Sequence, residues 1–283
     1  MKRRLSILTL CLAVLLCAAG IDPQSYLAHI KYLASPELRG RGTGTPGLEK
    51  AADYIAGKFD QAGLKAPAGE RFQRFDVTTN AKLGPANQLS WQEGASSGSA
   101  TFQDQFIPLN FSSEGRFEAG VVFVGYGITA AEYHYDDYAD VDVKGKFVLV
   151  MRHEPQEYDE NSVFAGKVYT AHSELFSKAS NAKMHGALGV LLVNDISNHG
   201  GNYGSLEDFQ GTVGPNNAGI PFVQVGAGVV KPWLAGAGQD LDEIGREIDG
   251  DLKPRSFAIP ALKVTLPRTI INRFGDASGR FIV

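Results

Sequence analysis

The chain has 283 residues, of which 43% are hydrophobic and 20% are charged, and its net charge is −4. This is the composition of an ordinary globular protein, and its acidic balance excludes the basic surface that nucleic-acid-binding proteins need. The two cysteines, Cys11 and Cys17, both lie in the first twenty residues, so the rest of the chain has neither a disulfide nor a thiol nucleophile.

The first twenty residues have the pattern of a secretory signal peptide. Three basic residues at positions 2–4 precede an apolar run over 5–16, and small residues follow at 18–20. The apolar run is short for a membrane span, and an uncleaved anchor is the alternative. Removal of this segment leaves 24 basic and 31 acidic residues, a net charge of −7. We therefore predict a secreted or periplasmic protein with no membrane association after cleavage.

Two amphipathic helices are predicted next, over 22–34 and 46–62. The first begins after Asp22, and the second has Thr45 as its N-cap and Pro46 at its first position. Each helix has one apolar face, made of Tyr26, Leu27, Ile30 and Leu33 in the first and of Leu48, Ala51, Ala52, Ile55 and Phe59 in the second. Each face requires a packing partner.

The turn between these helices contains a glycine pattern that resembles a dinucleotide site. It reads Gly42-Thr43-Gly44-Thr45-Pro46-Gly47, which satisfies G-x-G-x-x-G. A dinucleotide site also needs a preceding strand and an acidic residue about twenty positions later. No apolar strand precedes this turn, and Pro67 stands near the place of the acid. We therefore predict no cofactor site here and interpret the glycines as backbone freedom in a tight turn.

From residue 119 the pattern changes to short apolar strands separated by polar loops. Strands are predicted over 119–128, 145–152, 189–195 and 220–225, and helices over about 171–185 and 239–248. The first three strands are near-continuous runs of Val, Leu and Phe, which is typical of strands covered on both faces. In the helix over 171–185 we expect four buried side chains, those of Leu175, Ala179, Ala182 and Met184. This order of elements predicts an α+β fold.

Two parts of the sequence resemble one family. The segment at 32–63, which contains PELRGRGTGTPG with Arg39 and Arg41 in its turn, is similar to the opening of the secreted two-zinc aminopeptidases, the group that includes aminopeptidase Y and glutamate carboxypeptidase. Members of this group often carry an inserted protease-associated (PA) domain before the metal-binding core. The resemblance continues through 119–266, most specifically in YDDYADVDVKGKFVLVMRHEPQE at 135–157 and SKASNAKMHGALGVLLVND at 177–195. It implies a β-sandwich-like PA domain that lacks catalytic residues and assists substrate access or protein contact.

The resemblance and the composition together predict four segments. They are a signal peptide at 1–20, an N-terminal helical segment of a peptidase at 21–85, a PA-domain region at 86–266 and an irregular tail at 267–283. The predicted fold is α+β, with an N-terminal helix pair followed by a β-sandwich-like PA module and its flanking helices.

The catalytic residues of the family are not recognisable in this chain. Two-zinc hydrolysis needs His and carboxylate ligands around a bridging water and a further carboxylate as general base. The resemblance implies that a His-x-Asp segment, an Asp-Asn turn and a Glu-Glu pair follow residue 266, and none of these strings is present. The string that begins at Asp276 resembles the Asp-Asn turn only weakly, because it lacks the Asn. No serine stands beside a base in a recognisable order. We therefore assign no catalytic, cofactor-binding or metal-binding residue and expect no cofactor in this chain, although the family uses two zinc ions.

Several other residues could in principle bind a metal or a ligand. The metal-capable residues in moderate proximity are His153, Glu154, His172, Glu174 and His185. They offer no pair at i, i+4, so we interpret the histidines as structural. The acidic residues Asp136, Asp137, Asp140 and Asp142 lack the alternation and glycine of a calcium loop, which favours a solvated turn over a calcium site. We interpret Trp91 and Trp233 as packing residues, with ligand stacking as the alternative.

The sequence thus predicts a PA-domain-containing fragment of a secreted zinc aminopeptidase-like protein that ends before the catalytic domain and is non-catalytic as written. Its expected role is contact with a peptide or a protein. One alternative is half of a split metallo-aminopeptidase that removes N-terminal residues, with its zinc core on a separate catalytic chain. The other is a PA domain that acts alone as a binding module. Whether the chain belongs to an active enzyme, its substrate preference, its PA ligand and its oligomeric state are left open by the sequence.

We expect the signal peptide to be cleaved after Ala19 or Gly20, because either cut leaves small residues at the two positions that the peptidase reads. The N-terminal mass of the exported protein measures the cleavage site. A mature chain that still carries residues 5–16 would contradict the prediction of a secreted protein.

Overall fold

The computed structural model describes residues 22–42, 44–77, 80–194, 205–209, 217–269, 271–274 and 277–282. The predicted signal peptide lies outside these residues. The chain divides into two compact units, residues 1–77 with 276–283 and residues 78–275. In the described ranges, no helix has the length and apolar character needed to cross a membrane.

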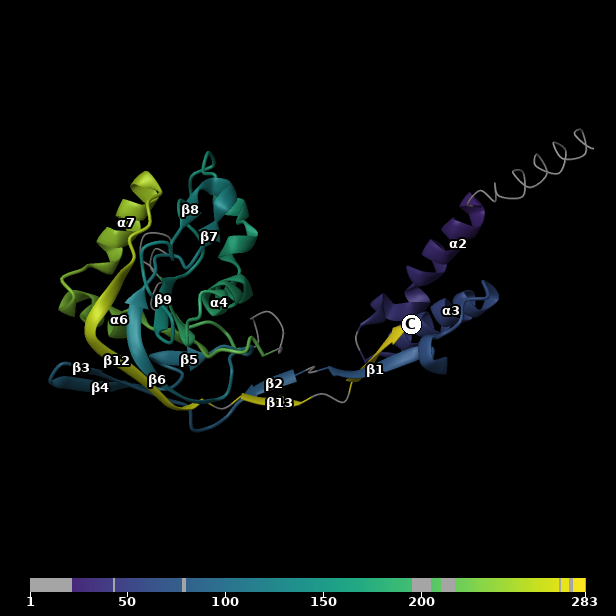
Figure 1. Ribbon diagram of the computed structural model, residues 1–283, viewed down its shortest axis with the longest axis horizontal. Helices are drawn as coiled ribbons and strands as arrows, with labels where there is room; N and C mark the ends of the chain where they lie inside the picture. Colours follow the sequence, from purple (N-terminus) through teal and green to yellow (C-terminus); the bar gives the residue numbers. More distant parts are fainter. Residues whose placement is uncertain are drawn as a thin grey trace, which may run out of the picture. The chain divides into compact units, whose positions relative to one another are not determined.

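The first unit contains the predicted helix pair (Figure 1). Helix α2 spans Pro23–Leu33 and helix α3 spans Pro46–Gln61. The Asp22 side chain accepts hydrogen bonds from the first turn of α2, and the Thr45 hydroxyl accepts one from the first turn of α3, as N-caps do. Short 3-10 helices, η1 (Pro36–Arg41) and η2 (Pro67–Gly69), follow the two α-helices.

The turn between the two helices is closely packed. Leu38 of η1 is fully buried, and a Cβ atom at Gly47 would lie only 2.0 Å from the carbonyl oxygen of Leu38. Gly44, in the same turn, has a φ of +74°. A close backbone approach and a left-handed conformation therefore account for these two glycines.

The C-terminal residues form strands, so the prediction of an irregular tail over 267–283 is wrong. Strand β12 spans Phe257–Thr269, β13 (Ile271–Phe274) pairs with β2 (Asn80–Leu83), and β14 (Ala277–Ile282) pairs with β1 (Phe72–Val77). Both pairings are antiparallel and join strands at opposite ends of the described chain. Such strands are stabilised by hydrogen bonds to a distant segment, which a local sequence pattern does not reveal.

The second unit is built on one eight-stranded sheet, in the order β4-β3-β12-β6-β9-β10-β11-β5. Its centre consists of four parallel strands, β6 (Gly115–Phe123), β9 (Phe147–Met151), β10 (Gly189–Val193) and β11 (Phe222–Val225). Antiparallel strands flank them, namely β12 with β3 (Gln88–Glu93) and β4 (Ser96–Ala100) on one side and β5 (Phe106–Pro108) on the other. The α+β class is confirmed. The main strands of the second unit form a single sheet, whereas the sequence predicted a β-sandwich-like arrangement.

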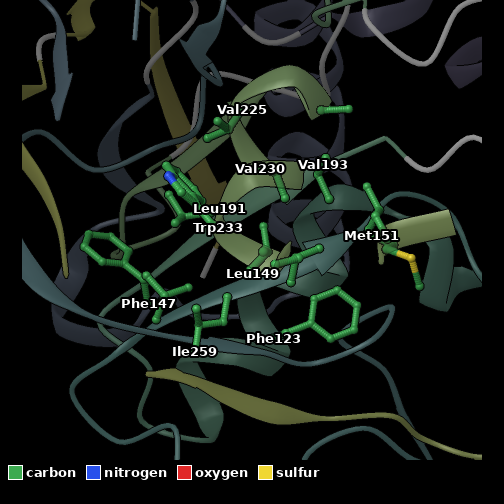
Figure 2. Packing of buried hydrophobic residues seen from close by; sticks show 14 of the residues in the cluster. Phe123, Phe147, Leu149, Met151, Leu191, Val193, Val225, Val230, Trp233 and Ile259 are labelled. Atoms are coloured by element: carbon green, nitrogen blue, oxygen red, sulfur yellow. The ribbon is translucent and has the colours of Figure 1, made fainter. Parts of the chain in front are cut away.

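Helices cover both faces of this sheet (Figure 1). Helices α6 (Ala227–Gly236) and α7 (Leu241–Asp251) pack on one face, and α4 (Leu175–Met184) packs on the other. Within β9, Leu149 and Met151 belong to the cluster with α6, while Val148 and Val150 belong to the cluster with α4. Figure 2 shows the first cluster, in which Trp233 lies among strand residues. Burial on both faces explains the continuous apolar runs in the sequence.

Helix α4 differs from its predicted burial in one position. Ala179 and Ala182 are buried as expected and Leu175 is partly buried, but Met184 is 78% exposed. Two helical residues separated by two positions point to nearly opposite sides, so Met184 cannot share the face of Ala182. The buried position that the pattern did not indicate is Lys178, which is 1% exposed.

The two tryptophans are packing residues, as predicted, and their rings contact each other. Trp233 is fully buried, and its ring meets that of Trp91 edge to face, with centroids 5.3 Å apart. This contact joins helix α6 to strand β3 and adds the energy of an aromatic pair to that of the buried area.

Replacement of Gly189 by alanine should destabilise the second unit by about 1–3 kcal/mol. A Cβ atom at this buried position would lie 2.5 Å from Cγ of Pro221 and 2.9 Å from Cε1 of Phe147. Gly228→Ala is the matched control, because this exposed residue in the first turn of α6 has no atom within 4 Å of the new Cβ. The control should be neutral or slightly stabilising. Urea unfolding measures both, and equal stabilities would contradict the described packing.

Candidate functional site

A long loop, residues 152–174, begins where β9 ends, and we refer to it as the candidate loop. Ligand sites of open parallel sheets lie at the carboxyl ends of the strands. Four non-glycine residues of this loop have left-handed backbones, namely His153, Gln156, Ala165 and Tyr169, with φ between 51° and 62°. Each such conformation costs roughly 1–3 kcal/mol and is concentrated at functional sites in proteins. The candidate loop is therefore a candidate functional site.

Three side chains of the candidate loop converge, and we name them the His–Glu–Tyr cluster: His153, Glu157 and Tyr169. Nδ1 of His153 lies 3.1 Å from Oε2 of Glu157 and 3.3 Å from the hydroxyl oxygen of Tyr169. The Tyr169 hydroxyl also donates a hydrogen bond to Oε1 of Glu157, which is 3% exposed. Desolvation and the Glu157 carboxylate hold the pKa of Tyr169 well above its ordinary value. The cluster thus combines an imidazole, a carboxylate and a phenol within contact distance.

Two further carboxylates anchor the candidate loop. Glu154 is fully buried and accepts hydrogen bonds from the backbone N–H and the hydroxyl of Thr170. Asp249 of α7 accepts a hydrogen bond from the backbone N–H of Gln156, at 2.8 Å. Desolvation raises the pKa of Asp249, and the charge of Glu157 raises it further. These bonds tie both ends of the loop and the helix α7 together around the His–Glu–Tyr cluster.

Asp137 organises the turn that follows β6. Its Oδ2 accepts hydrogen bonds from the backbone N–H groups of Tyr126, at 3.1 Å, and Ile128, at 3.0 Å, and its Oδ1 accepts one from the Tyr135 hydroxyl. Lys178 of α4 donates to the carbonyl oxygen of Tyr126. Burial raises the pKa of Asp137 to about 7. The expected solvated turn is therefore wrong for Asp137, which is 1% exposed.

The other acidic residues near Asp137 have separate partners. Asp136 accepts a hydrogen bond from the Thr129 hydroxyl, Asp142 forms an ion pair with Lys146, and Asp140 is exposed. These contacts hold strand ends and turns, and they do not direct the four carboxylates to one point.

The structure also separates the histidines that the sequence singled out. Nε2 of His172 lies 2.8 Å from Oε1 of Glu132, and Nε2 of His185 lies 3.2 Å from Oγ1 of Thr129. His153 belongs to the His–Glu–Tyr cluster, while Glu174 is an exposed residue at the start of α4. Across the described ranges, no three His, Cys, Asp or Glu side chains are grouped to hold a metal.

The sequence analysis did not consider one string that has the pattern around a catalytic serine. Residues 94–98 read Gly-Ala-Ser-Ser-Gly, which satisfies the G-x-S-x-G pattern. A nucleophile elbow places that serine on a turn from a strand to a helix. Here the string lies in the hairpin between β3 and β4, and Gly98 faces the ring of Trp91, where a Cβ atom would be 2.4 Å away. The string is a hairpin turn with a close aromatic contact.

The exposed large apolar side chains described in the second unit all come from one stretch of the chain, and we call them the apolar surface. They are Tyr158, Val163, Val168, Tyr169, Phe176 and Met184. Beside Phe176 and Met184 lies a groove of about 310 Å³, whose other lining residues include His172 and Asn181. Exposed apolar side chains beside a groove, as Phe176 and Met184 are here, are typical of protein contact sites.

Comparisons with known proteins bear on this arrangement. A family model described as "PA domain" matches residues 117–233. The chain contains a PA domain. This PA domain runs from β6 into α6 and includes Asp137, the His–Glu–Tyr cluster and the apolar surface.

Two solved structures resemble the whole chain more distantly. They are an aminopeptidase from Aneurinibacillus sp. strain AM-1, with 17% identity and a TM-score of 0.38, and BSAP, a zinc aminopeptidase from Bacillus subtilis, with 17% identity and a TM-score of 0.33. The matches cover 90% and 89% of this chain, and the chain spans 45% of the length of each solved structure. A comparison with curated proteins found no match.

Proposed function

We propose that this chain is the PA-domain part of a secreted zinc aminopeptidase-like protein, and that it binds a peptide or protein without hydrolysing it. The observation that carries the contact role is the apolar surface, because it lies wholly within the PA domain. The relation to aminopeptidases is supported by the sequence of the helix–turn–helix segment at 32–63 and by the PA domain that follows it.

The groove suits part of a polypeptide better than a whole small molecule. Its volume of about 310 Å³ is at the lower limit for ligand pockets, which is enough for one or two apolar side chains. Phe176 and Met184 supply apolar contact, and a methionine adapts to side chains of different shape. Asn181 and His172 also line the groove, where the Asn181 amide donates to the carbonyl oxygen of Gly127 and His172 is paired with Glu132. The favoured ligand is a peptide segment with large apolar side chains.

The proposed lack of catalysis rests on the sequence. It has no Glu-Glu pair at any position and no cysteine after Cys17. The proposed extracytoplasmic location rests on the signal-peptide pattern of residues 1–20, which precedes a chain with a net charge of −7.

A second candidate, half of a split metallo-aminopeptidase, is favoured by helix α2. No residue of this helix is buried, and its apolar residues Tyr26 and Ile30 are 61% and 46% exposed. An apolar helix face of this kind is stabilised when another polypeptide covers it. In this second candidate the covering polypeptide is a separate catalytic chain with the zinc core.

Replacement of both Phe176 and Met184 by serine should weaken peptide binding about tenfold, since truncation of central apolar contacts costs more than 1 kcal/mol. The probe is a fluorescein-labelled peptide of alternating leucine and threonine, and fluorescence anisotropy gives its Kd. Leu64→Ser is the matched control, because Leu64 is 53% exposed but belongs to the first unit. The contact role would be contradicted if the unaltered chain showed no saturable binding, or if the double variant bound as tightly as the control.

A further inference from the structure

The sulfur atoms of this chain are few, and they differ sharply in exposure. The sequence has three methionines and two cysteines, and Met1, Cys11 and Cys17 belong to the predicted signal peptide. The remaining two are described by the structure. Met151, in β9, is 0% exposed, whereas Met184, at the end of α4, is 78% exposed. After cleavage of the signal peptide, the chain therefore keeps two sulfur atoms, and only the side chain of Met184 is accessible to solutes.

The position of Met184 beside the groove is fixed by its neighbours on α4. The Asn181 amide donates to the carbonyl oxygen of Gly127, at 3.0 Å, and Nε2 of His185 lies 3.2 Å from Oγ1 of Thr129. These contacts hold the last turn of α4 against the segment that follows β6. The groove lies between the two, since its lining residues come from both. Met184 is thus held at the groove and is open to solvent there.

Oxidation would change the chemistry of this position in one step. With hydrogen peroxide, the methionine sulfur attacks one peroxide oxygen, so that an S–O bond forms while the O–O bond breaks. The bonded oxygen gives its proton to the departing oxygen, which leaves as water; the sulfur is oxidised by two electrons and the peroxide is reduced. A thioether is apolar and a weak acceptor, whereas the sulfoxide is polar. Because Met184 and Phe176 supply the apolar contact of the groove, the sulfoxide would place a polar oxygen against an apolar ligand.

We propose that Met184 is a reversible oxidation site, and that its conversion to the sulfoxide by a peroxide weakens peptide contact at the groove. This inference rests on the contact role proposed above and extends it, because peptide binding becomes dependent on the redox conditions around the protein. Methionine sulfoxide reductases reverse the step. Met151 does not respond in the same way, because its burial keeps the oxidant away from it.

Peptide mass mapping of the full chain after treatment with hydrogen peroxide tests the oxidation site. We expect one added oxygen atom on the peptide that contains Met184, and oxidation of Met151 that is at least about tenfold slower, since susceptibility follows exposure. In urea, which unfolds the chain, the two methionines should react at similar rates. Equal rates in the folded chain, or no reaction at Met184, would overturn the proposal.

Fluorescence anisotropy with the leucine–threonine peptide measures the effect on binding. Peroxide should raise the Kd of the unaltered chain about tenfold, because burial of a polar group without a partner opposes binding. Both methionine sulfoxide reductases, supplied with dithiothreitol, should restore the original Kd. In Met184→Leu the ratio of Kd after peroxide to Kd before it should be near one, whatever the starting affinity of this variant. Met151→Leu is the matched control and should keep the full response, since leucine has a similar volume in the core.

The two measurements separate this inference from the contact role. If the unoxidised chain shows no saturable binding, the contact role is contradicted and the proposed effect on binding falls with it, while mass mapping still decides the oxidation site. If the chain binds the peptide but peroxide leaves its Kd unchanged, the contact role stands and the proposal is overturned. A full response to peroxide in Met184→Leu would overturn it as well.

Discussion

The buried carboxylate of Asp137 is the constraint on which the arrangement of the PA domain depends. It satisfies two backbone N–H groups in the turn after β6, at Tyr126 and Ile128, and the hydroxyl of Tyr135. A buried carboxylate without such donors would cost several kcal/mol, and removal of one partner would leave the others unpaired. Gly125 is part of the same constraint, because a Cβ atom there would lie 2.4 Å from Oδ1 of Asp137. A side chain at position 125 would therefore disturb the turn.

This turn connects the sheet to the candidate loop through Tyr126. Its carbonyl oxygen accepts a hydrogen bond from Lys178 of α4, and its hydroxyl donates to Oδ1 of Asp249 in α7, at 3.3 Å. The same oxygen of Asp249 accepts from the backbone of Gln156 in the candidate loop. Helices from both faces of the sheet are thus bonded to Tyr126, and the loop at the end of β9 is bonded to the same Asp249 of α7. Through Gln156 the network holds the candidate loop, which carries the His–Glu–Tyr cluster.

The sequence predicted those elements whose local pattern decides their structure. The parallel strands and helices α2, α3, α4 and α7 were predicted because runs of Val and Leu, capping residues and helical spacing act within one segment. Helix α6 was not predicted, since Pro232 stands in its middle and proline ordinarily interrupts a helix. Strands β13 and β14 were missed because their partners, β2 and β1, are at the other end of the chain.

The candidate site was less predictable than the fold. His153 was recognised as metal-capable, but Glu157 stands four residues later without a helix between them, so helical spacing gave no reason to pair the two. Tyr169 follows Glu157 by twelve residues and reaches the cluster through backbone positions with positive φ. The residue types at these positions do not predict such a conformation. The exposure of Met184 was also not predicted: it was expected in the core, but two positions after Ala182 it points to the opposite side of the helix.

A contact role without peptidase activity is tested most directly by the release of p-nitroaniline from leucine p-nitroanilide. The purified chain is assayed alone, with zinc chloride, and with zinc chloride followed by a chelator. The role proposed for the PA domain predicts no release above that of buffer under any of these conditions. Zinc-stimulated release that the chelator abolishes, and that scales with the concentration of the purified chain, would contradict it.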